Sequence, residues 1–270
     1  MALSYRPPPA EWSLCPGEIH LCFVPLAASD ACLAHLEGVL APEELARARD
    51  FRTAALREAF VAARGLLRSI LGHCLGLAPE GLPLAFGAGG KPRVDLPGRL
   101  RFNLSHSGGC ALYALGRDGE LGVDLERIQA MPDAESIARR FFSPSEVADL
   151  LSLGGEARND AFFRCWTRKE AYVKATGEGL ALALDTFGVT LLPGAPPALN
   201  VPGDPRAWSL FEASPRAGYA AALVAEGAPA AIHAWAFADA DHCADYFGRD
   251  TLGTCHTIPP RCRKSACPPA

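Results

Sequence analysis

A chain of 270 residues is long enough for one large domain or two small ones, and its composition, 49% hydrophobic and 21% charged, is typical of a globular protein. The formal net charge of −4 gives no reason to expect nucleic acid or an anionic membrane as a partner. No apolar stretch reaches membrane-spanning length, the N-terminus lacks a signal-peptide layout and the ten cysteines are scattered, so we expect a cytoplasmic monomer with mostly reduced thiols.

Apolar periodicity and turn residues predict a similar order of elements in each half of the chain. In the first half we expect a strand over 19–25, helices over 41–49 and 54–75, a glycine-rich loop over 87–92, and short strands over 100–104 and 110–115. In the second half we expect a strand over 121–125, a helix that begins with the capping box Ser143-Pro144-Ser145-Glu146, a helix over 161–175, and strands over 187–192, 207–211 and 219–224.

The two halves also share a register. Pro42 and Pro144 are 102 residues apart (144 − 42), and so are Phe60 and Phe162 (162 − 60). Each pair lies at a matching place, in the capped helix or in the longer helix that follows. We therefore expect an α+β fold made of two similar halves related by a pseudo-twofold axis, with the active site in the cleft between them.

This register also predicts the domain boundaries. Residues 1–119 form the N-terminal half and residues 120–240 the C-terminal half. From about Asp239 the pattern degrades, and 253–270 carry Pro, Cys, Arg and Lys without apolar periodicity. Residues 241–270 are therefore expected to be a disordered tail.

Two carboxylates lie two residues apart in the segment Gly122-Val123-Asp124-Leu125-Glu126. Alternate residues of a strand point the same way, so Asp124 and Glu126 share one face while Val123 and Leu125 face the core. Paired carboxylates repel each other unless a cation such as Mg²⁺ neutralises them. On the pair alone, an ordinary strand with one solvated face is the commoner case.

A predicted helix carries the next group. Trp166, Glu170 and Lys174 are spaced four apart and share a face, with Lys169 at its border. This face could be a buried tryptophan beside a surface Glu–Lys pair. That interpretation is favoured for the face alone, and the functional one adds a third carboxylate and two ammonium groups that could hold a diphosphate.

Two further segments could contact phosphate. The turn Gly90-Lys91-Pro92 has no Walker ending, so its lysine is either solvated or a ligand contact. Ser105 and His106 follow on a predicted strand and could donate hydrogen bonds to phosphate. They could also be nucleophile and base of a hydrolase, although no Gly-x-Ser-x-Gly elbow surrounds them and adjacent strand residues point to opposite faces.

Basic residues on the first long helix could reach the same cleft. Arg57, Arg64 and Arg68 are spaced seven and four apart and lie on one side of that helix. Arg57 is expected to be solvated. Arg64 or Arg68 could contact a phosphate.

The order and spacing of these motifs resemble the 4′-phosphopantetheinyl transferase superfamily. The motifs are Gly-Lys-Pro, Phe-Asn-Leu-Ser-His-Ser, Gly-Val-Asp-Leu-Glu, Phe-Phe-Ser-x-x-Glu and Trp-x-x-Lys-Glu-Ala-x-x-Lys, spread over about residues 17 to 225. The chain is similar to the larger single-chain type, which activates nonribosomal peptide and polyketide synthases. The resemblance implies transfer of 4′-phosphopantetheine from coenzyme A to a serine of an apo acyl or peptidyl carrier protein, with Mg²⁺ as cofactor.

The resemblance also implies roles for the residues at matching positions. Asp124, Glu126 and Glu170 would bind magnesium, and Glu170 is also a candidate base for the carrier serine, in a catalytic group with Asp124 and Lys174. The residues that would contact coenzyme A are Arg64, Lys91, Pro92, Ser105, His106 and Lys169. The chain departs from the family at Glu44, where some members have a lysine, and an acid there is expected to repel the 3′-phosphate.

A non-catalytic module that binds coenzyme A or a carrier protein is the main alternative. Such a module would keep the fold and lose the metal ligands. All three carboxylates are present here, which favours the enzyme.

Overall fold

The structure, a computed structural model, describes residues 3–248 apart from 88 and 97–99. Its helices are α1 (Asp30–Gly38), α2 (Pro42–Arg49), α3 (Ala54–Leu75), α4 (Ala134–Phe141), α5 (Pro144–Leu151), α6 (Gly155–Thr176) and α7 (Ala240–Gly248). Its strands are β1 (Glu18–Pro25), β2 (Leu84–Phe86), β3 (Pro92–Val94), β4 (Arg101–Ser107), β5 (Cys110–Gly116), β6 (Leu121–Arg127), β7 (Gly188–Val189), β8 (Leu199–Asn200), β9 (Trp208–Glu212), β10 (Tyr219–Glu226) and β11 (Ala231–Ala236). The content is mixed helix and strand, as expected for an α+β protein.

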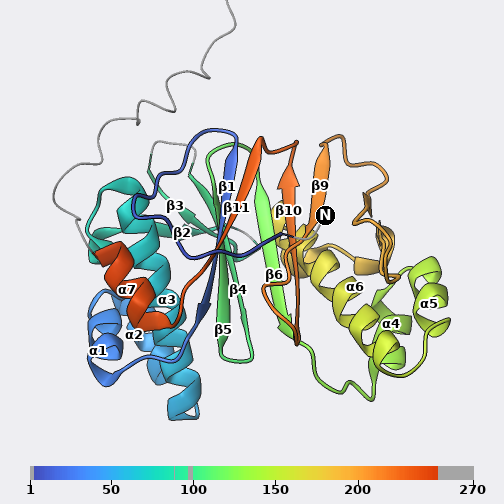
Figure 1. Ribbon diagram of the computed structural model, residues 1–270, viewed down its shortest axis with the longest axis horizontal. Helices are drawn as coiled ribbons and strands as arrows, with labels where there is room; N and C mark the ends of the chain where they lie inside the picture. Colours follow the sequence, from blue (N-terminus) through green and yellow to red (C-terminus); the bar gives the residue numbers. More distant parts are fainter. Residues whose placement is uncertain (1–2, 88, 97–99, 249–270) are drawn as a thin grey trace, which may run out of the picture.

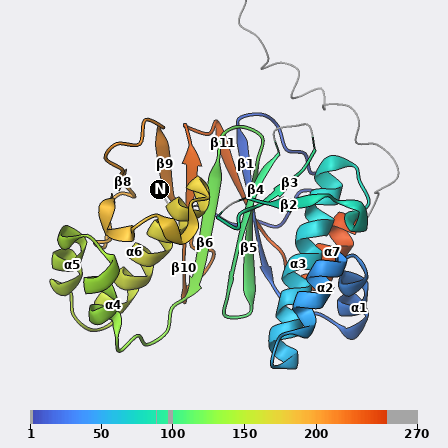
Figure 2. The same cartoon turned by 180° about the vertical axis from the view of Figure 1, so that it is seen from behind.

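Two sheets lie between two groups of helices (Figure 1). One sheet has the order β11-β1-β5-β4 and the other β6-β10-β9. Strand β1 shows how alternation builds the layers, since Cys22 and Val24 join the core under α3. Leu21 and Phe23 point the other way, into a core that both sheets share. The reverse view shows α3 and α6 at opposite ends of this stack (Figure 2).

Strand β4 connects the two sheets through polar side chains on one of its faces. Asn103 Oδ1 accepts a hydrogen bond from the backbone N–H of Val123 (3.0 Å), and Ser107 Oγ accepts one from the backbone N–H of Arg127 (3.1 Å). Ser105, between them, bonds a side chain of β6. The segment with the sequence Phe-Asn-Leu-Ser-His-Ser therefore holds β6 in register at the junction of the halves.

The C-terminal segment differs from the sequence prediction. Strand β11, which was not predicted, pairs in parallel with β1, and α7 packs on α3, so the chain returns to the N-terminal half. The expected disorder of 241–270 is wrong for the first eight of these residues, because Cys243, Ala244 and Phe247 form a short apolar face that is buried. Residues 249–270, with the predicted tail, lie outside the described residues.

Helices α1 and α4 were also not predicted, whereas α3 has the predicted bounds. Both helices, of nine and eight residues, are shorter than the windows of about 11–18 residues over which helical periodicity is judged. The strand expected over 187–192 is reduced to β7, which pairs only with the short strand β8.

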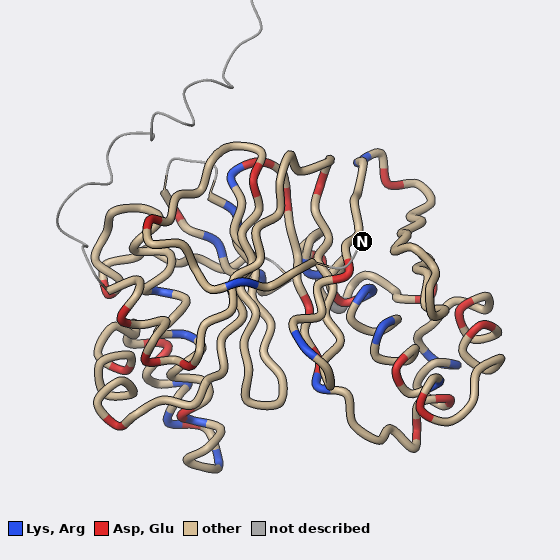
Figure 3. Tube along the Cα trace, viewed as in Figure 1, with Lys and Arg blue, Asp and Glu red and all other residues tan. Residues whose placement is uncertain are grey.

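The surface gives little further information on partners. Acidic and basic residues are interspersed along the trace (Figure 3), in keeping with the small net charge. None of the helices in the described part of the chain combines the length and apolar character that a membrane crossing requires. In the described part of the chain, Cys22, Cys32, Cys110, Cys165 and Cys243 are buried free thiols, and Cys74 is also buried.

Candidate active site

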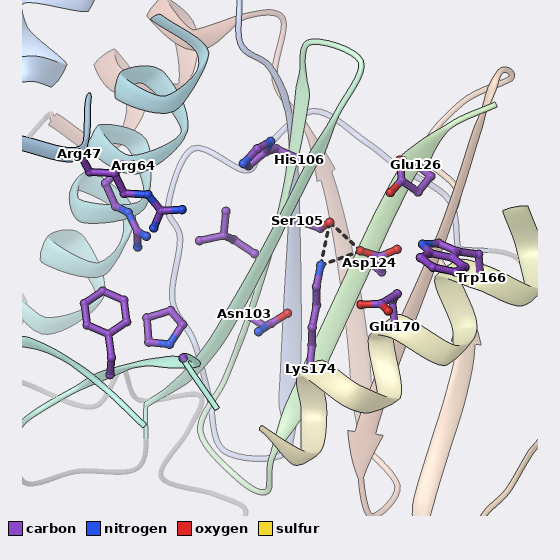
Figure 4. Close-up of a pocket in the computed structure, with 14 residues that line it drawn as sticks. Arg47, Arg64, Asn103, Ser105, His106, Asp124, Glu126, Trp166, Glu170 and Lys174 are labelled. Atoms are coloured by element: carbon purple, nitrogen blue, oxygen red, sulfur yellow. Dashed lines mark hydrogen bonds and ion pairs between the residues drawn. The ribbon is translucent and has the colours of Figure 1, made fainter. Parts of the chain in front are cut away.

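A pocket of about 490 Å³ lies between α3 and α6, beside strands β4 and β6 (Figure 4). Strands β4 and β6 and helices α3 and α6 each contribute side chains to it. The lining residues are Arg47, Arg64, Phe86, Gly90, Pro92, Asn103, Leu104, Ser105, His106, Asp124, Glu126, Trp166, Glu170 and Lys174. Most of the residues singled out in the sequence are therefore brought together, from segments up to 127 residues apart (174 − 47).

The acidic wall is built by β6 and α6. Val123 and Leu125 are buried between the sheets, so Asp124 and Glu126 face α6 as the alternation predicts. Gly122 permits the close packing, since a Cβ there would lie 2.2 Å from the carbonyl oxygen of Ala171. A side chain at this position would push α6 away from β6 and widen the site.

Asp124 is the most constrained group of the pocket. Its Oδ1 accepts hydrogen bonds from Ser105 Oγ (2.8 Å) and Lys174 Nζ (2.6 Å). Its Oδ2 is buried, and among the described residues it has no hydrogen-bond partner. A buried carboxylate oxygen without a partner is costly, and a cation would satisfy it.

The other two carboxylates are destabilised in their charged form. Burial raises the pKa of Glu126, and so does Asp124, while a hydrogen bond from Ser107 opposes the shift. Burial likewise raises the pKa of Glu170, with Asp124 next in importance. Three carboxylates line this part of the pocket, and the Oδ2 of one of them, Asp124, has no partner among the described residues. Carboxylate oxygens are ligands that Mg²⁺ accepts, so these residues fit the ion.

The opposite wall is basic. Arg64 is nearly buried, its Nη1 has no hydrogen-bond partner among the described residues, and burial lowers its pKa. Burial also lowers the pKa of His106, as do Lys174, Arg64 and Arg47. With Arg47, which also lines the pocket, these groups form a site suited to phosphate oxygens.

Glu44 does not oppose this wall as the sequence suggested. It is the third residue of α2, where its Oε2 accepts the backbone N–H of Ala41 (3.0 Å) and pairs with Arg68 Nε (2.5 Å). Its Oε1 is 3.4 Å from Arg64 Nε. The acid is thus neutralised by two arginines and holds Arg64 in place. A capping position after Pro42 was the signal that could have revealed this role.

Two lysines do not face the pocket as expected. Lys169 is fully buried, pairs with Glu146 (2.8 Å) and donates to the backbone oxygens of Leu184 and Phe187 (both 2.7 Å). It is therefore unavailable to a diphosphate. The ammonium of Lys91 is also bonded within the protein, to Glu120 and to two backbone oxygens, although its neighbours Gly90 and Pro92 line the pocket.

The geometry also argues against a hydrolase centred on Ser105. The Ser105 hydroxyl donates to Asp124 and accepts from Lys174 Nζ (3.0 Å), so its bonds run to these two residues. His106 lies on the next position of β4 and points away from it (Figure 4). No hydrogen bond joins the two among the bonds of the described residues.

A second cluster of possible metal ligands lies outside the pocket. Glu18, His20 and His233 bring ligand atoms within 4.8 Å of one another on β1 and β11. Trp235 Nε1 donates to His20 Nδ1 (3.2 Å), which places the proton of the neutral imidazole on Nε2, the nitrogen that faces Glu18. Burial lowers the pKa of His20 to about 4. A metal would have to displace that proton, so this cluster suits a metal less well than the acidic wall of the pocket does.

The raised pKa values predict how stability depends on pH. A glutamate whose pKa is higher in the folded than in the unfolded protein binds its proton more tightly in the folded protein. The free energy of unfolding therefore falls as pH rises from about 4.3, the ordinary pKa of glutamate, through the higher pKa of the folded protein. In chelator, Glu170→Gln should therefore melt at a higher temperature than wild type at pH 7. The difference should shrink as pH falls towards about 4.

The control for this comparison is Glu178→Gln, an exposed carboxylate just after α6, which should change the melting temperature little at either pH. A lower melting temperature for Glu170→Gln than for wild type at pH 7 would contradict the account of repulsion at this site.

Sequence comparison relates the chain to known proteins. Residues 120–224 match the model of the 4′-phosphopantetheinyl transferase superfamily. The 4′-phosphopantetheinyl transferase HetI of Nostoc sp. is 40% identical over 227 residues, which cover 83% of this chain and 94% of that protein. The 4′-phosphopantetheinyl transferase Sfp of Bacillus subtilis is 36% identical, over 47% of this chain and 55% of that protein.

A solved holo-(acyl-carrier-protein) synthase from Bacillus anthracis, in complex with CoA (3′,5′-ADP), is 20% identical with a TM-score of 0.35. It covers 40% of this chain and 94% of that chain, a likeness too slight to bear on the fold. The match to HetI is different in kind, because it extends over nearly the whole relative. On that match, the chain belongs to the 4′-phosphopantetheinyl transferase superfamily.

Proposed function

We propose that this protein transfers 4′-phosphopantetheine from coenzyme A to a serine of an apo acyl or peptidyl carrier protein, releasing 3′,5′-ADP. One observation carries the proposal. Asp124 and Arg64 line one pocket from opposite walls, and each has a buried polar atom, Oδ2 or Nη1, without a hydrogen-bond partner among the described residues. Coenzyme A with a divalent cation supplies both a positive ion and several phosphates.

Mg²⁺ is the proposed cofactor, held by Asp124, Glu126 and Glu170. When bound, it neutralises charge on the diphosphate, which is the main requirement of phosphoryl-type transfer. Ser105 fixes the rotamer of Asp124 through its 2.8 Å hydrogen bond, and Ser107 does the same for Glu126 (2.6 Å). These hydroxyls orient the carboxylates.

Lys174 is proposed to contact the diphosphate. It is held near Asp124 and Ser105 but keeps a third N–H donor, and it is 28% exposed towards the pocket. Arg47, Arg64 and His106 are proposed to bind the nucleotide phosphates, including the 3′-phosphate. The charge of the bound molecule is thus matched from both walls.

In the reaction, the carrier serine Oγ attacks the β-phosphorus, and the bond from phosphorus to the bridging oxygen breaks. That oxygen leaves with 3′,5′-ADP, and the serine proton passes to a carboxylate. Glu170 is the proposed base, since it lines the pocket beside Asp124 and a carboxylate has a second oxygen that can accept a proton.

The two halves are proposed to be related by a pseudo-twofold axis. In support, Glu44 and Glu146 occupy the same place in α2 and α5, 102 residues apart (146 − 44). Each forms a buried ion pair with the following long helix, through Arg68 and Lys169. One chain supplies both walls of the pocket, which supports action as a monomer, and we place the reaction in the cytoplasm.

The function is tested by incubating the protein with coenzyme A, Mg²⁺ and a panel of apo acyl and peptidyl carrier proteins, followed by intact mass. At least one carrier should gain the mass of one phosphopantetheine, and a chelator should prevent the gain. Asp124→Asn should slow transfer more than about 100-fold, because loss of even an outer-shell partner of a metal ligand costs about 10–100-fold.

Glu156→Gln, an exposed carboxylate in the first turn of α6, serves as the matched control and should transfer normally. Binding of coenzyme A without any mass gain on the whole panel would favour a non-catalytic binding module. Undiminished transfer in excess chelator would reject the magnesium assignment alone.

A second experiment tests the basic wall by comparing coenzyme A with dephospho-coenzyme A, which lacks the 3′-phosphate. Arg64→Met should weaken coenzyme A binding by the worth of a charge-assisted hydrogen bond, about 1.5–3 kcal/mol or about 10–100-fold. Binding of dephospho-coenzyme A should change little. Calorimetry measures both affinities.

The control is Arg57→Met, which removes an exposed arginine from the same helix and should leave both affinities unchanged. Glu44 keeps its bonds to Arg68 and Ala41 in the Arg64→Met variant, so the wall should stay folded. Equal losses for the two ligands would show that Arg64 does not read the 3′-phosphate.

A further inference from the structure

Lys91 lies in the turn between β2 and β3, yet its ammonium reaches the two elements that carry the acidic wall. Its Nζ is 2.9 Å from the carbonyl oxygen of Ala175 in the last turn of α6 and 3.0 Å from that of Leu121 at the start of β6. The third partner is Glu120 Oε2, at 2.8 Å. A lysine ammonium has three N–H donors, and these three acceptors use all of them.

The backbone around Lys91 is packed to allow this reach. A Cβ on Gly89 would lie 2.0 Å from the carbonyl oxygen of Gly177, so the turn touches the end of α6 directly. Gly177 ends α6 with a φ of 74°, which favours glycine. The stem of Lys91 lies over it, with Cδ 3.4 Å from where a Cβ on Gly177 would be. The ammonium is thus delivered to the negative end of the helix dipole.

The position of this bond matters for the site. Ala175 follows Lys174 directly, and Leu121 precedes Asp124 by three residues. The 2.6 Å contact between Lys174 and Asp124 therefore depends on how α6 sits along β6, and Lys91 bonds both elements close to that contact. Figure 4 shows Asp124 and Lys174 approaching each other from these two elements.

We propose that Lys91 is a positioning residue, which holds the end of α6 against the start of β6 and so keeps Glu170 and Lys174 opposite Asp124. It is not a ligand of the nucleotide. This inference rests on the proposed function, because its first readout is the rate of transfer. Its second readout, the binding of 3′,5′-ADP, requires only that this nucleotide binds at the basic wall.

The test is Lys91→Met, which keeps the length of the stem and removes the ammonium. Single-turnover transfer at saturating coenzyme A should fall about 10- to 100-fold, because a displacement of about 1 Å can cost about 10²-fold. The dissociation constant of 3′,5′-ADP, measured by calorimetry without magnesium, should change less than about threefold. Lys91→Arg keeps the charge but cannot place one compact ammonium among three acceptors, so it should not restore the rate.

Arg101→Met is the matched control, since Arg101 pairs with the same Glu120 (2.8 Å) from an exposed position at the start of β4. It should transfer and bind as wild type does. If Lys91→Met does not melt cooperatively, Glu120→Gln replaces it. That variant weakens one of the three bonds and should slow transfer less, again with 3′,5′-ADP binding unchanged.

Two outcomes would overturn the proposal while wild type is active. One is a dissociation constant for 3′,5′-ADP raised about tenfold or more with a normal rate at saturation, which would make Lys91 a nucleotide ligand. The other is a normal rate of transfer and normal 3′,5′-ADP binding in Lys91→Met, or in Glu120→Gln if that variant is used in its place. If the wild-type protein transfers nothing, the proposed function itself is rejected. That result differs from both outcomes above, in which wild type is active.

Discussion

One buried carboxylate connects the elements of this site. Asp124 of β6 is bonded by Ser105 of β4 and Lys174 of α6 through a single oxygen, and its other oxygen is buried without a partner among the described residues. Leaving a buried acceptor unpaired costs about 1–3 kcal/mol or more for a charged group. Glu126 and Glu170 add like charge next to it. Such an arrangement is unfavourable for the protein alone and becomes favourable when a cation is bound.

The rest of the fold holds this unfavourable arrangement together from outside the pocket. The ion pairs Glu44–Arg68 and Glu146–Lys169 are buried, and each fixes a short helix against a long one. Removing one partner of such a pair leaves an uncompensated buried charge, so both pairs are hard to replace singly. The opposing walls of the pocket are therefore carried on rigid elements, which suits a substrate that must be held on both sides.

Local patterns in the sequence predicted several of the helices and strands and one face of the site. The bounds of α3, the capping of α5, and the shared face of Asp124 and Glu126 follow from periodicity and capping, which depend on neighbouring residues only. Strand β11 could not be predicted in its place, because its partner β1 is more than 200 residues away and no local turn signal joins the two. The register of the two halves suggested where α2 and α5 lie, but it gave no sign that the chain returns to the first half.

Two lysines show most clearly what the sequence could not predict, the direction of a side chain. Lys169 and Glu170 are adjacent, yet one is buried against α5 and the other lines the pocket, since successive helical residues point about 100° apart. Which of them faces the ligand is decided by Glu146, a residue on another helix. Lys91 is similar, because its acceptors come from β6 and α6 rather than from its own turn. A motif places a residue near a site, but tertiary packing decides the direction of its side chain.

The central claim is that Asp124, Glu126 and Glu170 hold a divalent cation. Its most direct test is a crystal structure with coenzyme A and Mn²⁺, an oxygen-preferring ion whose anomalous scattering locates it without ambiguity. The account predicts one strong anomalous peak within bonding distance of Asp124 Oδ2 and of oxygens from Glu126 and Glu170. A peak that lies only at the cluster of Glu18, His20 and His233, or a coenzyme A bound in the pocket with no peak beside Asp124, would contradict it.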